Sequence, residues 1–146
     1  MTTDVRKIEE EAIGAVLSGW AEAIGRKDAR AALAYVTDDV VEFSLAPPLQ
    51  FKGKDEAGLN EWFATWKGPI GDETCDARLI AGSDVAFWYG LVHMTGTKTD
   101  GFKVDLWFRQ TTGLRKVGGV WKIAHQHASV PFAMDGSGRA LLDLKP

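Results

Sequence analysis

Two histidines near the C-terminal end carry the side chains of this sequence best suited to acid–base chemistry. They are His125 and His127, in the run 119–132 that reads GVWKIAHQHASVPF. Imidazole gains and loses a proton near neutral pH, so histidine commonly serves as a general acid or base. Because alternate side chains of a β-strand share a face, the two histidines are expected side by side, on the floor of a partly polar cavity. The other members of that face are Trp121, Ile123 and Ser129.

Three roles are open to this histidine pair. Each ring can be a structural group that bonds to its neighbours in the cavity wall, as most buried histidines are. The pair can instead carry out acid–base chemistry on a bound small molecule. Two histidines can also bind a metal ion, but zinc needs a third protein ligand, for which Asp105 and His93 are the candidates. The sequence does not establish that third ligand, and our prediction contains no metal.

A second candidate group lies on the segment 102–112, whose side chains alternate in character. One face carries Lys103, Asp105, Trp107, Arg109 and Thr111, and the other carries Phe102, Val104, Leu106, Phe108 and Gln110. Asp105 and Arg109 stand four residues apart on the first face. They can form an ion pair with each other, or Arg109 can bind a substrate carboxylate or enolate, which its planar guanidinium group fits.

Aromatic side chains are the third feature, since the chain contains six tryptophans. They indicate either a tryptophan-rich core or an aromatic cavity with a few polar groups, which is the usual composition of a small-molecule site. The residues that we expect around such a cavity are Trp20, Tyr35, Trp62, Trp66, Tyr89 and Trp107.

The elements that position these residues follow from periodicity and turn signals. We predict helices over 4–26, with Asp4 as N-cap, over 29–36, with Asp28 as N-cap, and over about 54–66. One strand, 40–45, precedes Pro47-Pro48, and Gly68-Pro69 ends the third helix. Four strands form a meander over 74–81, 84–95, 102–115 and 120–130. This order indicates an α+β fold, and we expect one domain over 1–146, with a core of about 5–132 and a tail of 133–146.

Composition excludes several classes of partner. The net charge is −3 and there is no basic patch, so we expect neither nucleic acid nor an anionic membrane as a partner. Cys75 is the only cysteine, which excludes an internal disulfide and fits a cytoplasmic protein. No secretory signal or membrane-spanning run is evident.

Two motifs carry a resemblance to a known family. The segment 35–41, YVTDDVV, resembles the start of the nuclear-transport-factor-2-like fold, and 119–129 resembles the end of its SnoaL-like branch. The chain is also similar to the association domain of calcium/calmodulin-dependent kinase II. Over about 5–132, the resemblance implies a strongly curved antiparallel β-sheet that wraps around three N-terminal helices as a cone, with a pocket at its open end.

The resemblance does not extend to the known functional residues of two relatives. The three catalytic positions of the steroid isomerases fall nearest to Ser44, Trp20 and Thr111, and none matches, so we do not expect that activity. The cavity arginines of the kinase association domain are replaced by Tyr89, by Thr111 or Thr112, and by Ala128.

The resemblance also puts Thr111 toward the cavity. The odd-numbered face of 102–112 would then line the cavity, and Thr111 joins the expected binding residues. The even-numbered face would form an apolar stripe outside the sheet, through which two copies would pair as a homodimer.

We therefore predict a SnoaL-like protein that binds a small apolar or aromatic molecule. As an enzyme it would be an isomerase, cyclase or lyase that needs no cofactor, with His127 as the acid–base residue supported by His125, Asp105 and Arg109. The alternative is a non-catalytic module of the same fold for ligand binding or oligomerisation.

Overall fold

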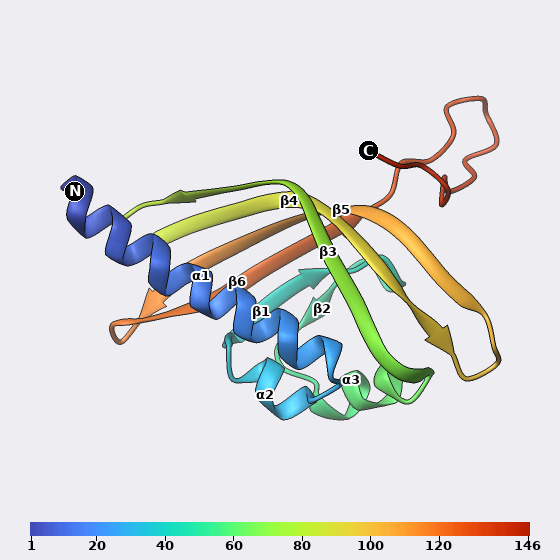
Figure 1. Ribbon diagram of the computed structural model, residues 1–146, viewed down its shortest axis with the longest axis horizontal. Coiled ribbons are helices and arrows are strands. Elements are labelled where there is room, and N and C mark those ends of the chain that lie inside the picture. The colour runs from blue at the N-terminus through green and yellow to red at the C-terminus, as the bar shows by residue number, and fades with distance from the viewer.

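Three helices lie under one face of a curved six-stranded sheet (Figure 1). The computed structural model describes residues 1–146. The helices are α1 (Thr3–Gly25), α2 (Ala29–Leu33) and α3 (Glu56–Phe63), and the strands are β1 (Val36–Phe43), β2 (Phe51–Lys52), β3 (Trp66–Ala81), β4 (Val85–Lys98), β5 (Lys103–Val117) and β6 (Val120–Ser129). The strand order is β2-β1-β6-β5-β4-β3. The predicted α+β class with a curved sheet over N-terminal helices is confirmed, with the addition that β1 and β6 pair in parallel.

Capping side chains fix where the helices begin. Asp28 caps α2, as predicted, by accepting a hydrogen bond of 3.0 Å from the Ala31 amide. The cap of α1 is Thr2 rather than Asp4, because the Thr2 hydroxyl accepts a bond of 3.2 Å from the Val5 amide. Asp55 caps α3, which is therefore shorter at its start than predicted.

The third strand begins earlier than the sequence indicated. Gly68 and Pro69 were expected to end a helix, but they lie inside β3, where its pairing with β4 is irregular between Lys67 and Gly71. Gly68 has a φ of +78°, a conformation that glycine adopts without strain. Trp66 is consequently the first residue of a strand and not the last turn of a helix.

Two buried clusters join the helices to the sheet. The larger cluster packs Ile13 of α1 against Leu114 of β5 and Ile123 of β6, which are at most 2% exposed. The smaller cluster contains Phe63, Trp66 and Ile70 at the other end of the sheet. We call the sheet face that meets the helices the inner face, and the opposite face the outer face.

The inner face of β5 is formed by even-numbered residues. Thr112 and Leu114 are 1% and 2% exposed, and Leu114 belongs to the cluster around Ile13. Arg109 and Thr111 point the other way and are exposed. Our prediction that the odd-numbered face lines the cavity is therefore wrong by one residue, and the apolar stripe of even-numbered residues lies inside.

A β-bulge at Ala124 corrects the predicted face of β6. Leu114 pairs with Ile123, but the next residue along β5, Gly113, pairs with His125, so Ala124 is an extra residue in the ladder. Ile123 faces α1, whereas His125 and His127 lie on the outer face, because Gln126 between them is buried opposite Thr112. Strict alternation, which placed Trp121, Ile123 and both histidines together, fails at this bulge.

The remaining chain extends beyond the sheet. Residues 133–146 follow β6 on the side of the outer face, where they project from the sheet as a loop whose end returns toward it (Figure 1). None of the helices is both long and apolar enough to cross a lipid bilayer.

Candidate functional site

The two histidines of β6 are held on the outer face by an aromatic neighbour and a backbone carbonyl. The ring nitrogen Nδ1 of His125 lies 2.6 Å from the carbonyl oxygen of Val41. The ring of Phe43 stands edge-on to both imidazoles, at 4.8 Å from His125 and 5.2 Å from His127. His127 is exposed and lines a groove of about 730 Å³ with the loop 44–50. The contacts of His125 with Val41 and Phe43 are those expected of a structural histidine.

Asp105 and Arg109 do not pair with each other. Asp105 lies 2.5 Å from Nε2 of His93, and this contact lowers the pKa of the Asp105 carboxyl group. Glu73 lies 3.8 Å from the other nitrogen of the same ring, and Trp107 stacks on that ring at 4.5 Å. Arg109 donates instead to the Ser129 hydroxyl over 3.1 Å. The predicted catalytic residues therefore share the outer face, but they do not converge on His127.

The predicted binding residues are divided between the two faces. Tyr89, Trp107 and Thr111 lie outside, since they pair within the odd-numbered outer register of β4 and β5. Trp20, Tyr35, Trp62 and Trp66 belong to the helical side: Trp20 and Trp62 pack against the buried clusters, and Trp66 is only 3% exposed. Tyr35 approaches α1 closely at Gly19, where a Cβ atom would lie 2.3 Å from the tyrosine oxygen. The expected single aromatic cavity is thus not formed.

The inner face carries a polar group that the sequence analysis missed. Glu42 of β1 is in register with Gln126 of β6, which is in turn opposite Thr112 of β5, so the three side chains share the inner face. Gln126 is 8% exposed and its Nε2 donor has no hydrogen-bond partner. The Gln110 amide donates to the Thr112 hydroxyl over 3.3 Å. We call Glu42, Gln110, Thr112 and Gln126 the inner polar group.

Burial is the main influence on the pKa of Glu42. Desolvation raises the pKa of its carboxyl group, and nearby His125 opposes this shift only in part. No hydrogen bond or ion pair stabilises the carboxylate. A carboxyl group of this kind, beside an unsatisfied buried donor, can exchange a proton with a bound molecule and orient it.

The inner face beside this group is only partly buried. The two buried clusters include Leu114 near one end of β5 and Val104 near the other. Between them, Leu106 and Phe108 point inward but are only partly buried. This stretch of the inner face is apolar, reached by solvent, and bordered by the inner polar group.

One signal in the sequence pointed to Glu42. Val40 and Glu42 occupy alternate positions of the predicted strand 40–45, in which Glu42 is the only charged residue, so an inward Val40 implies an inward glutamate. The resemblance places Ser44, and not Glu42, nearest to the catalytic position of the relatives. Gln126 was missed because the expected alternation gave the inner face to the histidines.

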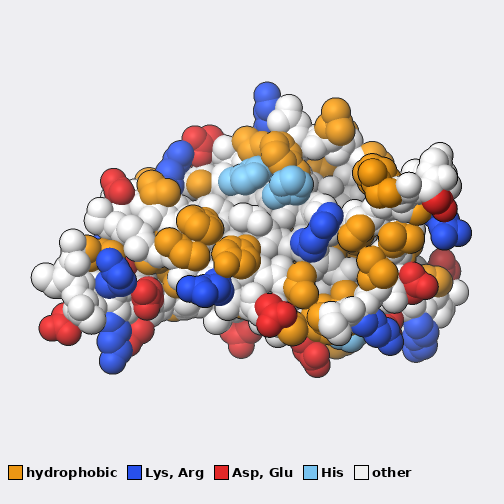
Figure 2. All heavy atoms as spheres, turned by 90° about the horizontal axis from the view of Figure 1, so that it is seen from above, with side chains coloured by type: hydrophobic (Ala, Val, Ile, Leu, Met, Phe, Trp, Pro, Cys, Tyr) orange, Lys and Arg blue, Asp and Glu red, His pale blue; other side chains and the backbone are white.

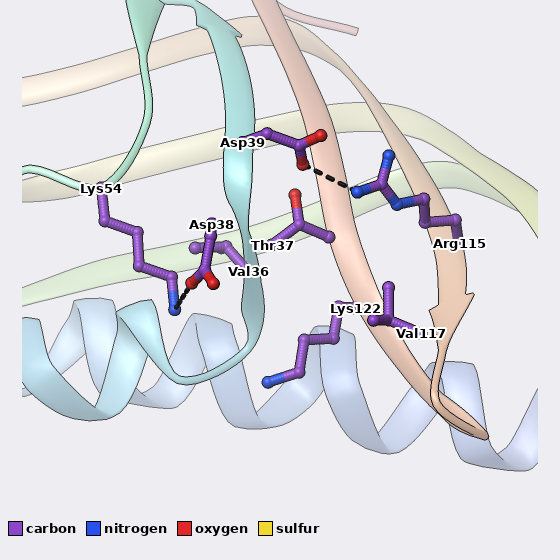
Figure 3. Close-up of a pocket in the computed structure, with 8 residues that line it drawn as sticks. All are labelled: Val36, Thr37, Asp38, Asp39, Lys54, Arg115, Val117 and Lys122. Carbon is purple, nitrogen blue, oxygen red and sulfur yellow. Dashed lines mark hydrogen bonds and ion pairs between the residues drawn. The ribbon is translucent and has the colours of Figure 1, made fainter.

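A separate cleft of about 410 Å³ lies where β1 passes the end of β5 (Figure 3). Its charges are largely paired: Lys54 lies 3.3 Å from Asp38, and Arg115 donates to Asp39 over 2.8 Å. The Thr37 hydroxyl and Arg115 lower the pKa of Asp39. We interpret this cleft as a solvated set of ion pairs, of which Asp39–Arg115 links β1 to β5 across the intervening strand β6.

No group of three His, Cys, Asp or Glu side chains is arranged to hold a metal ion. The outer face carries two separate groups of such side chains. In one, His93 contacts Asp105 and Glu73. In the other, His125 lies near His127 on β6.

Comparisons with known proteins agree with this architecture. A comparison with curated proteins finds no match. An NTF2-like protein of unknown function from Pseudomonas putida KT2440 has 30% identity and a TM-score of 0.85, over 96% of this chain and 98% of that one. A ketosteroid isomerase-like protein from Erwinia carotovora atroseptica has 27% identity and a TM-score of 0.67, over 82% and 93%. The association domain of CaMKII from C. elegans shares the fold at 17% identity and a TM-score of 0.68, over 87% and 99%. Residues 13–133 match the SnoaL-like domain, and the chain therefore belongs to the SnoaL-like family.

Proposed function

We propose that this protein binds a small, largely apolar molecule on the inner face, with Glu42 as its acid–base residue. The observation that carries the proposal is the unpaired carboxyl group of Glu42 beside the buried, unsatisfied Nε2 donor of Gln126. Buried polar groups in native proteins are usually satisfied by the protein, by ordered water or by a ligand, and here the protein itself supplies no partner. Leu106 and Phe108 provide apolar surface next to them.

The chemistry that suits this pair is proton transfer. Ionised Glu42 would take a proton from a carbon next to a carbonyl group or from a hydroxyl group of the ligand, and a carboxylate of raised pKa is a stronger base than an ordinary one. Gln126 would donate a hydrogen bond to the oxygen that gains negative charge. An isomerisation or an elimination of this type needs no cofactor. The similarity to a ketosteroid isomerase-like protein is consistent with it.

This proposal moves the acid–base role from His127 to Glu42. His127 lies on the other side of the sheet from the inner polar group, and the sheet separates the two. Acid–base chemistry by histidine would require a ligand in the outer groove instead, so one experiment can distinguish the two locations.

Binding of 2-naphthol, a fused aromatic ring with one hydroxyl group, tests the proposal by isothermal titration calorimetry. We expect wild-type protein to bind it, and Glu42→Gln and Gln126→Leu each to weaken binding about tenfold, because a hydrogen bond to a charged group contributes about 1.5–3 kcal/mol. His127→Ala is the matched outer-face control and should leave the affinity unchanged. Loss of binding in His127→Ala alone, or no binding by wild type, would contradict the proposal.

The outer face favours a second function, self-association. Phe87 and Tyr89 stack at 6.3 Å and are 45% and 40% exposed, and Phe43 and Trp107 lie on the same face. Figure 2 shows this side of the molecule, with histidines beside hydrophobic side chains and scattered charges around them. We propose that two copies pair through this face, although not through the stripe that the sequence predicted. An analytical ultracentrifugation series over protein concentration tests it, and a monomer at all concentrations would contradict it.

A further inference from the structure

The C-terminal segment 131–146, which we call the arm, has a defined shape of its own. The Leu141 amide donates to the Pro131 carbonyl over 2.9 Å, and the Ala133 amide donates to the Arg139 carbonyl over 2.8 Å. Phe132 and Ala140 pair as an antiparallel bridge. Asp135 closes the turn by accepting bonds of 3.0 and 2.6 Å from the amide and hydroxyl of Ser137. The arm is therefore a small hairpin and not a loose tail.

This hairpin has no core within its own chain. Its large apolar side chains are exposed: Phe132 by 57%, Met134 by 88%, Leu142 by 56% and Leu144 by 47%. A two-stranded hairpin alone is marginally stable in water. An ordered hairpin with this much exposed apolar surface is typical of a segment that packs on another surface.

The arm stands on the side of the outer face. In Figure 1 it rises from the end of β6, and the chain then returns toward the sheet. Lys145, next to the last residue, is close enough to Asp105 of the outer face to contribute to the lowered pKa of that carboxyl group. The arm therefore projects from the face through which we propose that two copies pair.

The same face contains a groove of matching character. It lies at the ends of β1 and β6, between His127 and the loop 44–50, with a volume of about 730 Å³. Its walls include Phe43, Leu45 and Leu49 and no Asp, Glu, Lys or Arg side chain. Leu49 is 96% exposed, so this groove is also without a partner in the single chain.

We propose that the arm of each copy packs into the outer groove of a second copy, so that the homodimer is held by two exchanged arms. This inference rests on the dimer proposed above. The second copy is the occupant because each chain offers both an unpartnered apolar hairpin and an unpartnered apolar groove on one side, and a two-fold axis joins two such pairs at once. The arm does not fill its own groove, as the exposure of Met134 and Leu49 shows.

Disulfide trapping between two differently substituted chains tests the exchange. In a Cys75→Ser background, which removes the only native thiol, one chain carries Met134→Cys and the other carries Leu49→Cys. We expect mixing and mild oxidation to give a cross-linked heterodimer. Chains with Ile8→Cys, an exposed apolar position on α1, replace the Leu49→Cys chain as the control and should remain uncross-linked.

Two further measurements keep the arm and the dimer separately testable. Met134→Glu combined with Leu142→Glu should weaken the dimer at least tenfold in ultracentrifugation, with the secondary structure unchanged by circular dichroism. A wild-type dimer whose affinity is unaffected by these substitutions would overturn the arm exchange and leave the outer-face dimer standing. Formation of the 49–134 disulfide within single chains that carry both cysteines, in place of the cross-link between chains, would also overturn it. A monomeric wild type would overturn both proposals.

Discussion

Glu42 is withdrawn from water by the fold without receiving a partner for its charge. Its raised pKa means that the native state holds a proton more tightly than the unfolded chain does. Between the ordinary and the raised pKa, native protein binds more protons, so stability falls as pH rises through this window. At pH 7, above the ordinary glutamate pKa, the raised pKa of Glu42 therefore lowers the free energy of unfolding.

Replacing Glu42 by its neutral isostere should remove this cost. We expect Glu42→Gln to raise the midpoint of thermal unfolding at pH 7. The difference from wild type should disappear below about pH 4, the ordinary range of a glutamate, where both side chains are neutral. Calorimetry across this pH range measures the effect.

Glu61→Gln is the control for this measurement, because Glu61 is exposed on α3. It should leave the unfolding midpoint unchanged at every pH. A Glu42→Gln variant that is less stable than wild type at pH 7 would show that the carboxylate has a stabilising partner, in contradiction to the arrangement of the inner polar group.

Besides its apolar contacts, the long helix α1 is joined to the sheet by the carboxylate of Glu9. Glu9 accepts a bond of 2.6 Å from Lys116, and it also accepts from the indole N–H of Trp121, which is 4% exposed. The hydrogen bonds from Lys116 and Trp121 lower the pKa of Glu9. A lowered pKa stabilises the fold above the ordinary glutamate pKa, and this contribution is lost as pH falls through the lowered value.

Glu9→Gln should consequently lower the unfolding midpoint at pH 7, because it removes the charge that Lys116 faces and weakens the acceptor of Trp121. The deficit should shrink as the solution is acidified below about pH 4. Glu10→Gln, on the same helix but exposed, is the matched control in a thermal unfolding series. Equal midpoints of Glu9→Gln and wild type at neutral pH would contradict a tie at this position.

The sequence predicted the elements better than it predicted their faces. Each of the four meander strands was located from alternation and turn residues, and three of them within a few residues, because those signals are local. The inward side of β6 depends on one extra residue, Ala124, whose place in the ladder is set by pairing with β5. An alanine carries no signal of a bulge, so only the tertiary structure could show it. Because the bulge was not predicted, the sequence analysis assigned both histidines to the inner face and did not identify Gln126 as an inward residue.

The predicted start of β3 was wrong for a related reason. Trp66 continues the aromatic spacing of α3, and that local pattern extends the helix. The structure instead makes Trp66 the first residue of a strand, paired with Lys98 of β4 and buried in the cluster that contains Ala29 of α2. Contacts between distant segments decided this boundary, and they are not visible in the local spacing.

At the scale of the whole molecule, the outer face determines the assembly that we propose. Tyr89→Glu places a charge in the middle of this face, next to Phe87. We expect it to shift the protein from dimer to monomer at micromolar concentration, as measured by light scattering after size exclusion. Ile8→Glu makes the same change at a residue of α1 that is 64% exposed, and it should leave the molar mass unchanged.

Thermal unfolding gives an independent reading of this assembly. When a folded dimer unfolds to monomers, mass action makes the midpoint rise with protein concentration. We expect this rise in wild type and its absence in Tyr89→Glu. A wild-type midpoint that is independent of concentration would argue against the dimer.

The bulge at Ala124 changes the inward positions of the last strand from odd-numbered to even-numbered residues. Beyond it, Gln126 faces inward while His125 and His127 face outward. On β5 the same division holds between even and odd residues. Two surfaces are thus encoded in interleaved positions of the same strands, and they share no side chains. A substitution on one surface removes no side chain from the other, so selection, or a protein engineer, can change the proposed ligand site and the proposed assembly surface at separate positions.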